Sequence, residues 1–363
     1  FLWLAMKLAG PYYVFLANLP VLALLMALIG ILAAHAARET EPADAGISVG
    51  ILTAALLLGF DPDLLVYMTN PYRDPLSYVL LTGSLLLLVR YGASPGRGRL
   101  RLAGAGVLLG LAYGVREPSL LALGPMFLLG ILYERRSGLR AILRSACAFG
   151  VGLLAGALPL LYQTFVLRQQ VAISPYSGSR GTLLPGLHGV AFPATISKAA
   201  AYFLGHMGWI PVLLLLVAAG FATARRNRAM LGLALLAGIY AVFYGFYWIF
   251  SSRYYYVVAL CGAPLVAFGT YAATSSLLRL ARRSAWTGPA FRWIVLLLSL
   301  AIGAKRLAAG SADRPFRAEQ ARRFTETMLS TTPLNVTIYC ERPLADVIRT
   351  LAGRSTAQLD LSN

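Results

Sequence analysis

Long apolar runs separated by short polar loops most strongly limit how this chain folds. The run Tyr12–Ala37 alone exceeds the roughly 20 residues that a helix needs to cross a bilayer. The composition agrees, because 58% of the residues are hydrophobic and only 13% are charged, whereas a soluble domain carries about 25% charged residues. The sequence therefore predicts an all-α polytopic membrane protein.

Arginines gather in every second loop from Tyr91 onward. The four arginine-rich groups are Arg90, Arg97, Arg99 and Arg101; Arg135, Arg136, Arg140 and Arg144; Arg225, Arg226 and Arg228; and Arg279, Arg282, Arg283 and Arg292. Short loops rich in Lys and Arg face the cytoplasm, so these groups predict the cytoplasmic side of the membrane. This placement also argues against a nucleic-acid partner as the reason for the net charge of +18.

The alternation of loops predicts about ten transmembrane helices, with the C-terminal tail outside the cytoplasm. The predicted spans are Tyr12–Ala37, Gly46–Phe60, Pro75–Tyr91, Leu102–Val115, Ser119–Tyr133, Ser145–Val166, Gly208–Ala222, Met230–Phe250, Tyr254–Ala273 and Trp293–Ala304. One loop fits poorly, since Arg38–Ala45 is predicted to be cytoplasmic yet carries Glu39, Glu41 and Asp44. Acidic residues contribute little to orientation, so the prediction stands.

The composition changes after the last predicted span. We expect a transmembrane domain over Phe1–Ala304 and an extracytoplasmic segment over Lys305–Asn363. Asn335–Cys340 has strand character and Pro343–Leu351 that of a helix, which is typical of the start of a small α/β domain. Because the chain begins at Phe1 inside an apolar stretch, we expect residues to be missing upstream, and the tail to be cut off.

Cysteines and histidines give no sign of a metal site. They are spread over the chain without CxxC spacing, at Cys147, Cys261, Cys340, His35, His188 and His206. A lone histidine is more often a loop or interface residue than a ligand.

The polar stretch Gly59–Tyr78 lies between two apolar runs and is the strongest candidate for a site. It carries Asp61, Asp63, Arg73 and Asp74 among several prolines and tyrosines. Lipid cannot satisfy such groups, so the stretch must lie at a membrane exit or in a cavity lined by protein. We interpret it as one wall of an active site on the non-cytoplasmic side. The alternative is an ordinary connecting loop with carboxylates in water.

Three motifs together resemble the GT-C glycosyltransferases. They are LLLGFDPDLLVYMTNPYRDPLSYVLL, GLAYGVREPSLLALGPM and SRYYYVVALCGAPLVAFGTY, and their order and spacing carry the resemblance. The branch most similar is that of bacterial relatives of protein O-mannosyltransferases and aminoarabinose–lipid A transferases, in glycosyltransferase family 39. The resemblance covers roughly Phe1–Ala304 and implies a GT-C-like helical bundle in the inner membrane of a bacterium.

Enzymes of this family take a sugar from a polyprenyl-phosphate carrier and place it on a lipid, glycan or protein hydroxyl at the external face. Their catalytic Asp in the first external loop has no match here, so the resemblance implies a general base upstream of Phe1. Their second acidic position matches Asp74, to which the resemblance gives a catalytic role. A divalent cation at Asp74 stays open, and no other cofactor is expected.

The leaving phosphate needs a fixed positive charge, and arginine binds phosphate through two parallel hydrogen bonds. Arg116 and Arg253 both lie at predicted external span ends, and Tyr254 adjoins Arg253. We expect these three residues to bind the donor phosphate. The alternatives are a pair with Glu117 or a snorkelling anchor for Arg116, and an interfacial anchor for Arg253.

We expect Asp74, Arg116 and Arg253 to meet in one external cavity, with the loop Leu167–His206 over or beside it. Asp61, Asp63 and Arg73 are weaker candidates, because Asp-Pro-Asp is also a common turn. A transporter or lipid flippase, or a non-catalytic scaffold of the cell envelope, remains an alternative to a transferase. Transporters usually hold ionisable groups at the middle of the membrane on broken helices, whereas the charges here cluster at span ends.

Overall fold

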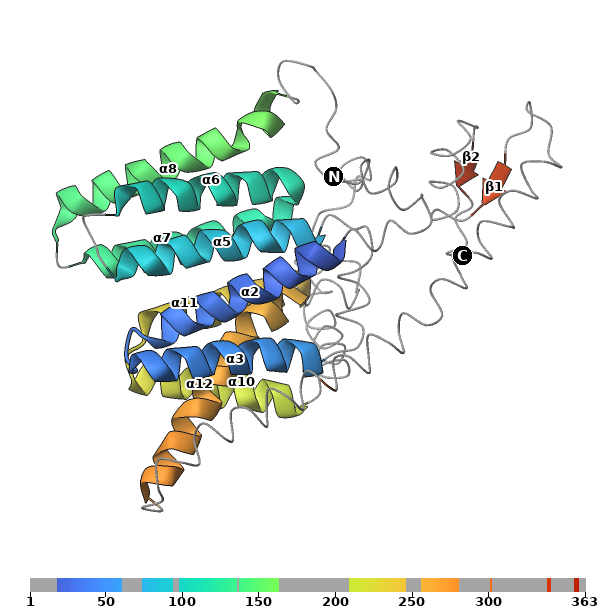
Figure 1. Ribbon diagram of the computed structural model, residues 1–363. Helices are drawn as coiled ribbons and strands as arrows, with labels where there is room; N and C mark the ends of the chain where they lie inside the picture. The colour runs from blue at the N-terminus through green and yellow to red at the C-terminus, as the bar shows by residue number, and fades with distance from the viewer. Residues whose placement is uncertain are drawn as a thin grey trace, which may run out of the picture.

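The structure is a computed structural model, and it describes residues 18–60, 74–93, 98–135, 137–162, 209–245, 256–280, 301, 338–340 and 356–358. Within these ranges the chain forms nine α-helices, one 3-10 helix and two short strands. The helices run side by side as a bundle (Figure 1). The predicted all-α membrane fold is thereby confirmed.

The helix bounds follow most of the predicted spans. The last described helix, Tyr256–Leu280, continues past its predicted end at Ala273 and includes Arg279, which was predicted to lie in a loop. The helices are α2 (Asn18–Ala37), α3 (Ala43–Phe60), α5 (Asp74–Gly92), α6 (Arg99–Val115), η2 (Glu117–Ala122), α7 (Leu123–Glu134), α8 (Leu139–Leu161), α10 (Trp209–Ala224), α11 (Arg228–Gly245) and α12 (Tyr256–Leu280). Of the tenth predicted span, Trp293–Ala304, only residue 301 is described.

Four of the described helices are long and apolar enough to cross a membrane: Pro20–Ala37, Asp74–Gly92, Leu139–Leu161 and Tyr256–Ser275. The shorter apolar helices are Ala43–Leu57, Pro118–Glu134, Leu215–Ala224 and Arg228–Tyr244. Together they make this chain a multi-pass membrane protein.

Two predicted spans differ from the structure at their N-terminal ends. The span predicted over Ser145–Val166 begins earlier, at Leu139, so the helix α8 includes Arg140 and Arg144. Arginine is a good helix former and keeps its charge in water while its stem lies on the helix, so the charged turn does not end the helix. Gly138 precedes α8 at a φ of 85°, a conformation that favours glycine.

The other difference lies between α6 and α7. The span predicted from Ser119 begins as the tight 3-10 turn η2, with Pro118 near its start, and becomes an α-helix only at Leu123. Arg116, between α6 and η2, has an extended backbone with φ −153° and ψ 118°. The helical backbone is therefore interrupted at Arg116, between α6 and η2.

The helices pack in a continuous series of neighbours. Starting from one side, α8 packs on α6, α6 on α5, α5 on α2, and α2 on α3 (Figure 1). Helix α12 packs on α3 and is flanked by α10 and α11. One hydrophobic core runs through this series, with Tyr91, Tyr240 and Phe268 among its largest fully buried side chains.

Glycines bring α6 and α8 into close contact. A Cβ on Gly152 would collide with the carbonyl oxygen of Ala103, and one on Gly156 with that of Val107. From the other side, Gly106 and Gly110 face the backbone of α8 in the same way. Pairs of small residues four apart let two membrane helices approach until their backbones touch.

Two three-residue strands lie in the C-terminal segment. β1 (Ile338–Cys340) pairs in parallel with β2 (Thr356–Gln358). The strand predicted over Asn335–Cys340 is confirmed at Ile338–Cys340. Parallel strands need a crossover connection, commonly a helix. The predicted helix Pro343–Leu351 falls between the strands and outside the described residues, and the division at Ala304 stays a prediction.

Candidate active site

Asp74 and Arg116 form an ion pair between two helices. Asp74 is the first residue of α5, where the positive end of the helix dipole favours a carboxylate. Arg116 follows α6, and its Nη1 contacts Oδ1 of Asp74. Both side chains are largely buried, with 11% of Arg116 and 16% of Asp74 exposed. The structure thus brings together two of the residues that the sequence singled out.

Tyr78 is the second partner of Arg116. It lies one helical turn after Asp74 on α5, so both side chains are on the same face. Nη1 of Arg116 donates a hydrogen bond of 2.7 Å to the hydroxyl of Tyr78. The guanidinium carbon also lies 5.9 Å from the centre of the Tyr78 ring. The contact with Tyr78 therefore combines a hydrogen bond with a cation–π interaction.

Helix α11 supplies two more aromatic side chains. The guanidinium carbon of Arg116 lies 5.9 Å from the ring centre of Tyr244. One turn earlier, the Tyr240 ring stacks on that of Tyr244 with centres 6.0 Å apart. The Tyr240 hydroxyl donates a hydrogen bond of 3.1 Å to the carbonyl oxygen of Pro118. Helix α11 thus contacts both the guanidinium and the turn that carries it.

A pair of buried serines holds the same turn against α5. The hydroxyls of Ser77 and Ser119 lie 2.7 Å apart, and both residues are inaccessible or nearly so. This bond joins the residue before Tyr78 to the 3-10 helix that follows Arg116. The relative position of Asp74 and Arg116 is therefore supported by this serine pair as well as by their own attraction.

Five predicted site residues fall outside the described residues: Arg253, Tyr254, Asp61, Asp63 and Arg73. Arg116 pairs with Asp74, and the side chain of Glu117, its alternative partner, lies outside the described side chains. Among the described residues, no three His, Cys, Asp or Glu side chains gather as metal ligands do.

Tyr78 and Tyr244 were not predicted. The spacing of Tyr78 from Asp74 pointed to one helix face, but nothing in the sequence linked α11 to Arg116.

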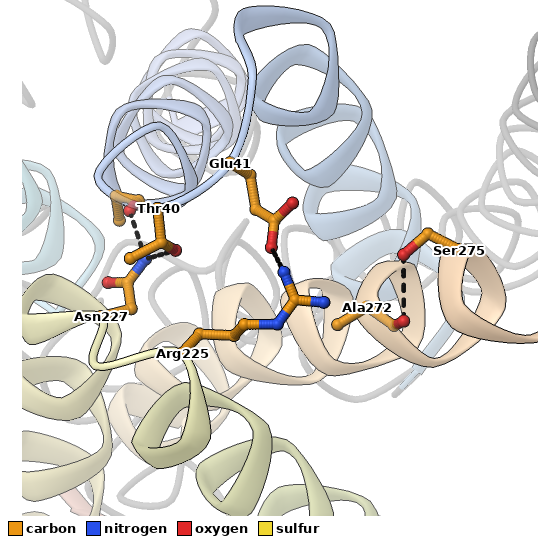
Figure 2. A network of polar contacts seen from close by, with 7 residues as sticks. Thr40, Glu41, Arg225, Asn227, Ala272 and Ser275 are labelled. Atoms are coloured by element: carbon orange, nitrogen blue, oxygen red, sulfur yellow. Dashed lines mark hydrogen bonds and ion pairs between the residues drawn. The ribbon is translucent and has the colours of Figure 1, made fainter. Parts of the chain in front are cut away.

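The opposite end of the bundle holds a different polar network. Arg225 forms an ion pair with Glu41, and Nδ2 of Asn227 donates to the Ala36 carbonyl at 2.8 Å and to the Thr40 hydroxyl at 3.0 Å (Figure 2). Figure 2 also shows Ser275 bonded to the carbonyl of Ala272 on α12. The contacts of Arg225 and Asn227 join the loop after α2 to the loop after α10.

Two further contacts continue this network. The Ala229 amide donates a hydrogen bond of 2.7 Å to Oε2 of Glu39. Because burial removes water from its carboxylate, the pKa of Glu39 is raised, although the bond from Ala229 and the nearby Arg228 oppose the shift. The acidic loop that fitted poorly with the predicted topology thus pairs with a basic loop on the same end of the bundle.

Tyr91, Glu134 and Ser145 form a buried cluster on α5, α7 and α8, also at this end. The Tyr91 hydroxyl donates to Glu134 and lies 3.0 Å from the Ser145 hydroxyl. A small, mostly apolar pocket adjoins Ser145 and is lined by Leu88, Met126 and Phe149 among others. It is separate from the Asp74–Arg116 pair, which lies at the other end of α5.

Comparison with solved structures identifies the fold. The crystal structure of ArnT from Cupriavidus metallidurans bound to undecaprenyl phosphate is similar to 99% of this chain, over 74% of its own length. The TM-score is 0.59 and the sequence identity is 16%. No protein-family model and no curated protein matches the chain. At this identity the likeness concerns the fold alone, which this chain shares with the ArnT structure.

Proposed function

We propose that this membrane protein, which has a GT-C-like fold, transfers a sugar from a polyprenyl-phosphate donor to a hydroxyl of a lipid, glycan or protein. The observation that carries the proposal is the buried Asp74–Arg116 pair between tyrosines at one end of the bundle. The similar ArnT structure holds undecaprenyl phosphate, so this fold can accommodate a lipid phosphate.

Arg116 takes the role of binding the leaving phosphate. In the reaction the bond between C1 of the sugar and the phosphate oxygen breaks, and the electron pair stays on the polyprenyl phosphate. The new bond forms between C1 and the acceptor oxygen, whose proton passes to a carboxylate or to water. A fixed guanidinium stabilises the charge that develops on the phosphate, and it does so most strongly where water is scarce.

Asp74 takes the role of orienting the acceptor or assisting its deprotonation. A carboxylate has two oxygens, so pairing with Arg116 through Oδ1 is compatible with an acceptor hydroxyl donating to the second one. Arrival of a phosphate at Arg116 also weakens the pull of the guanidinium on Asp74. Donor binding then prepares the carboxylate for the acceptor.

Arg253 and Tyr254 complete the proposed phosphate site. The segment 246–255, which carries them, joins α11 to α12, and the last turn of α11 bears Tyr244 beside Arg116. This connection supports the proposal that Arg253 approaches the same phosphate. Asp61, Asp63 and Arg73 precede Asp74 in the chain and remain secondary candidates for the acceptor side.

We place the site on the extracytoplasmic face of the bacterial inner membrane. The arginine-rich ends of α5 and α8 support this placement, since they lie at the opposite end of the bundle from Asp74. A cysteine placed at Ser179 is expected to react with an impermeant reagent added from outside, and one at Arg140 is not. The reverse pattern would overturn the placement.

The deciding experiment measures sugar transfer by the purified protein. Release of undecaprenyl phosphate from an undecaprenyl-phosphate-linked sugar, matched by glycosylation of an acceptor mixture, supports a transferase. Arg253→Ala is expected to lose most of this activity, and Arg253→Lys to regain part of it, because lysine keeps the charge but lacks the planar fork. Movement of the intact donor across proteoliposomes without cleavage would replace the transferase with a flippase.

A further inference from the structure

Helix α11 presents two tyrosines to Arg116 from outside the α5–α6 pair. Tyr240 and Tyr244 are four residues apart, so they lie on one face of the helix, and each is 2% exposed. Tyr244 contacts the guanidinium, whereas Tyr240 contacts the ring of Tyr244 and the carbonyl of Pro118. Of the two buried rings, Tyr244 therefore contacts the charged group and Tyr240 contacts Tyr244.

The kind of contact matters for a phosphate-binding arginine. A guanidinium binds phosphate with N–H groups that lie in its own plane. Asp74 and the Tyr78 hydroxyl contact Nη1, and so they hold the side chain by the same kind of group that a phosphate needs. A ring attracts the cation through its π-electrons and uses no N–H donor. Tyr244 is thus suited to hold Arg116 while the ligand at its N–H groups changes.

Tyr240 supports the position of the Tyr244 ring beside Arg116. Stacking at 6.0 Å limits the movement of the Tyr244 ring, and the hydrogen bond to Pro118 joins α11 to the turn that carries Arg116. Phe243 also packs edge-on against the Tyr244 ring, and the two ring centres are 5.1 Å apart. Such packing supports the precise placement that a binding group requires.

We infer that Tyr244 is a positioning residue that holds the guanidinium of Arg116 in place for the donor phosphate, with Tyr240 supporting its ring. The inference rests on the proposed function, because it takes Arg116 to be a phosphate ligand. It adds that the affinity of the site for a lipid phosphate depends on the π-electrons of a side chain on α11.

The test replaces Tyr244 by phenylalanine and then by phenylalanines with one, two and three ring fluorines in the full chain. Fluorine withdraws π-electron density with little change in size, so packing is nearly preserved while the attraction for a cation falls. The dissociation constant of undecaprenyl phosphate is measured in detergent micelles, with undecaprenol as the reference without a phosphate. We expect Tyr244→Phe to bind within about twofold of the wild type. Affinity then falls stepwise with fluorination, by about 2- to 30-fold in all.

The same fluorinated series at Tyr271 is the matched control. Tyr271 is a half-buried tyrosine of α12 that packs on the core near Ala272, at the opposite end of the bundle. It is expected to leave the affinity for undecaprenyl phosphate unchanged, and binding of undecaprenol is expected to stay constant in both series.

Each outcome separates the inference from the proposed function. If wild-type protein binds undecaprenyl phosphate no better than undecaprenol, the proposed function fails. If the wild type prefers the phosphate and the fluorinated series at position 244 is flat, the proposed function stands and the inference fails. A change in melting temperature along the series without a change in phosphate affinity per folded molecule gives Tyr244 a structural role only, and overturns the inference as well.

Discussion

Two ends of the bundle each contain an ion pair between an arginine and a carboxylate from different helices or loops. At one end Arg116 contacts Asp74, and at the other Arg225 contacts Glu41. In both pairs at least one side chain is largely buried. The two pairs are chemically alike, so whatever distinguishes them comes from their surroundings.

The surroundings of Arg225 consist of backbone groups and helix caps. Asn227 donates to the end of α2, its Oδ1 accepts from the Met230 amide at 2.9 Å, and Glu39 accepts from the Ala229 amide. These bonds satisfy helix ends that would otherwise lack partners. The Arg225–Glu41 pair thus belongs to a network whose evident result is to join two loops.

The surroundings of Arg116 include polar and aromatic side chains that could interact with a ligand. Its partners include a carboxylate, a hydroxyl and two aromatic rings, at the start of α5 and the end of α11. The comparison teaches that an interhelical ion pair alone says little about function. Backbone capping marks the structural pair, and aromatic support of the cation marks the proposed site.

The largest expected effect comes from removing Arg116. Arg116→Ala is expected to lower sugar transfer per folded molecule by about 10²–10³, the usual result of losing a preorganised contact to developing charge. Arg116→Lys is expected to recover part of this activity, since it keeps the charge without the fork. The measurement is turnover with an undecaprenyl-phosphate-linked sugar, corrected for the folded fraction.

Arg225→Ala is the matched control, because it breaks the ion pair at the other end. We expect it to lower stability while turnover per folded molecule stays within about twofold of the wild type. Equal losses of turnover in both variants would end the distinction between a functional and a structural pair.

The sequence predicted the membrane part of the fold well, for a physical reason. Apolar length and arginine placement are local properties, so the ends of α2, α3 and α6 fall at the predicted residues Ala37, Phe60 and Val115. The start of α8 was missed, because arginines were taken as loop residues although helix ends tolerate them. The partners of Glu39 and Glu41 are distant in the chain, so the sequence did not reveal them.

The candidate site was predictable in part. Asp74 and Arg116 were found because both are charged residues at predicted external span ends. Their meeting was predicted, but the direct ion pair was not, since it depends on how closely α5 and α6 pack. Tyr244 was missed for a stronger reason. It is a tyrosine within an apolar helix, like Tyr113 or Tyr271, and only packing in three dimensions places it beside Arg116.

The second prediction concerns a substitution at the α6–α8 contact that is expected to lower stability. Gly152→Ala places a Cβ against the backbone of Ala103 and is expected to destabilise the α6–α8 contact by about 1–3 kcal/mol. A Cβ on Gly150, in the same helix, meets nothing within 4 Å, so Gly150→Ala is the control. Melting temperature in detergent measures both. Equal melting temperatures for the two variants would contradict the close helix contact.

The third prediction has a smaller expected effect and concerns the polar network at the Arg225 end of the bundle. Asn227 is fully buried and caps the start of α11 through the Met230 amide. Asn227→Ala is expected to cost about 1–2 kcal/mol of stability, as the loss of a helix cap does. Turnover per folded molecule is expected to stay at the wild-type level. A loss of turnover in the folded protein would show that this end takes part in function.

The smallest effect concerns pH and Glu39. Burial raises the pKa of its carboxyl above the usual 4.5, so the folded protein holds this proton more tightly than the unfolded chain does. The stabilisation from this group is therefore fully present below pH 4.5 and is lost as pH rises through the raised value. Glu39→Gln keeps an oxygen for the Ala229 amide and cannot ionise.

The variant Glu39→Gln is accordingly expected to gain melting temperature relative to the wild type as pH increases above 4.5. Because the Glu39 side chain remains partly exposed, water screens its charge and the gain is small. A difference that shrinks with rising pH would mean that contacts with Ala229 and Arg228 outweigh burial at this carboxyl. The acidic loop would then be held by charge rather than by the helix caps that distinguish this end from the Asp74–Arg116 end.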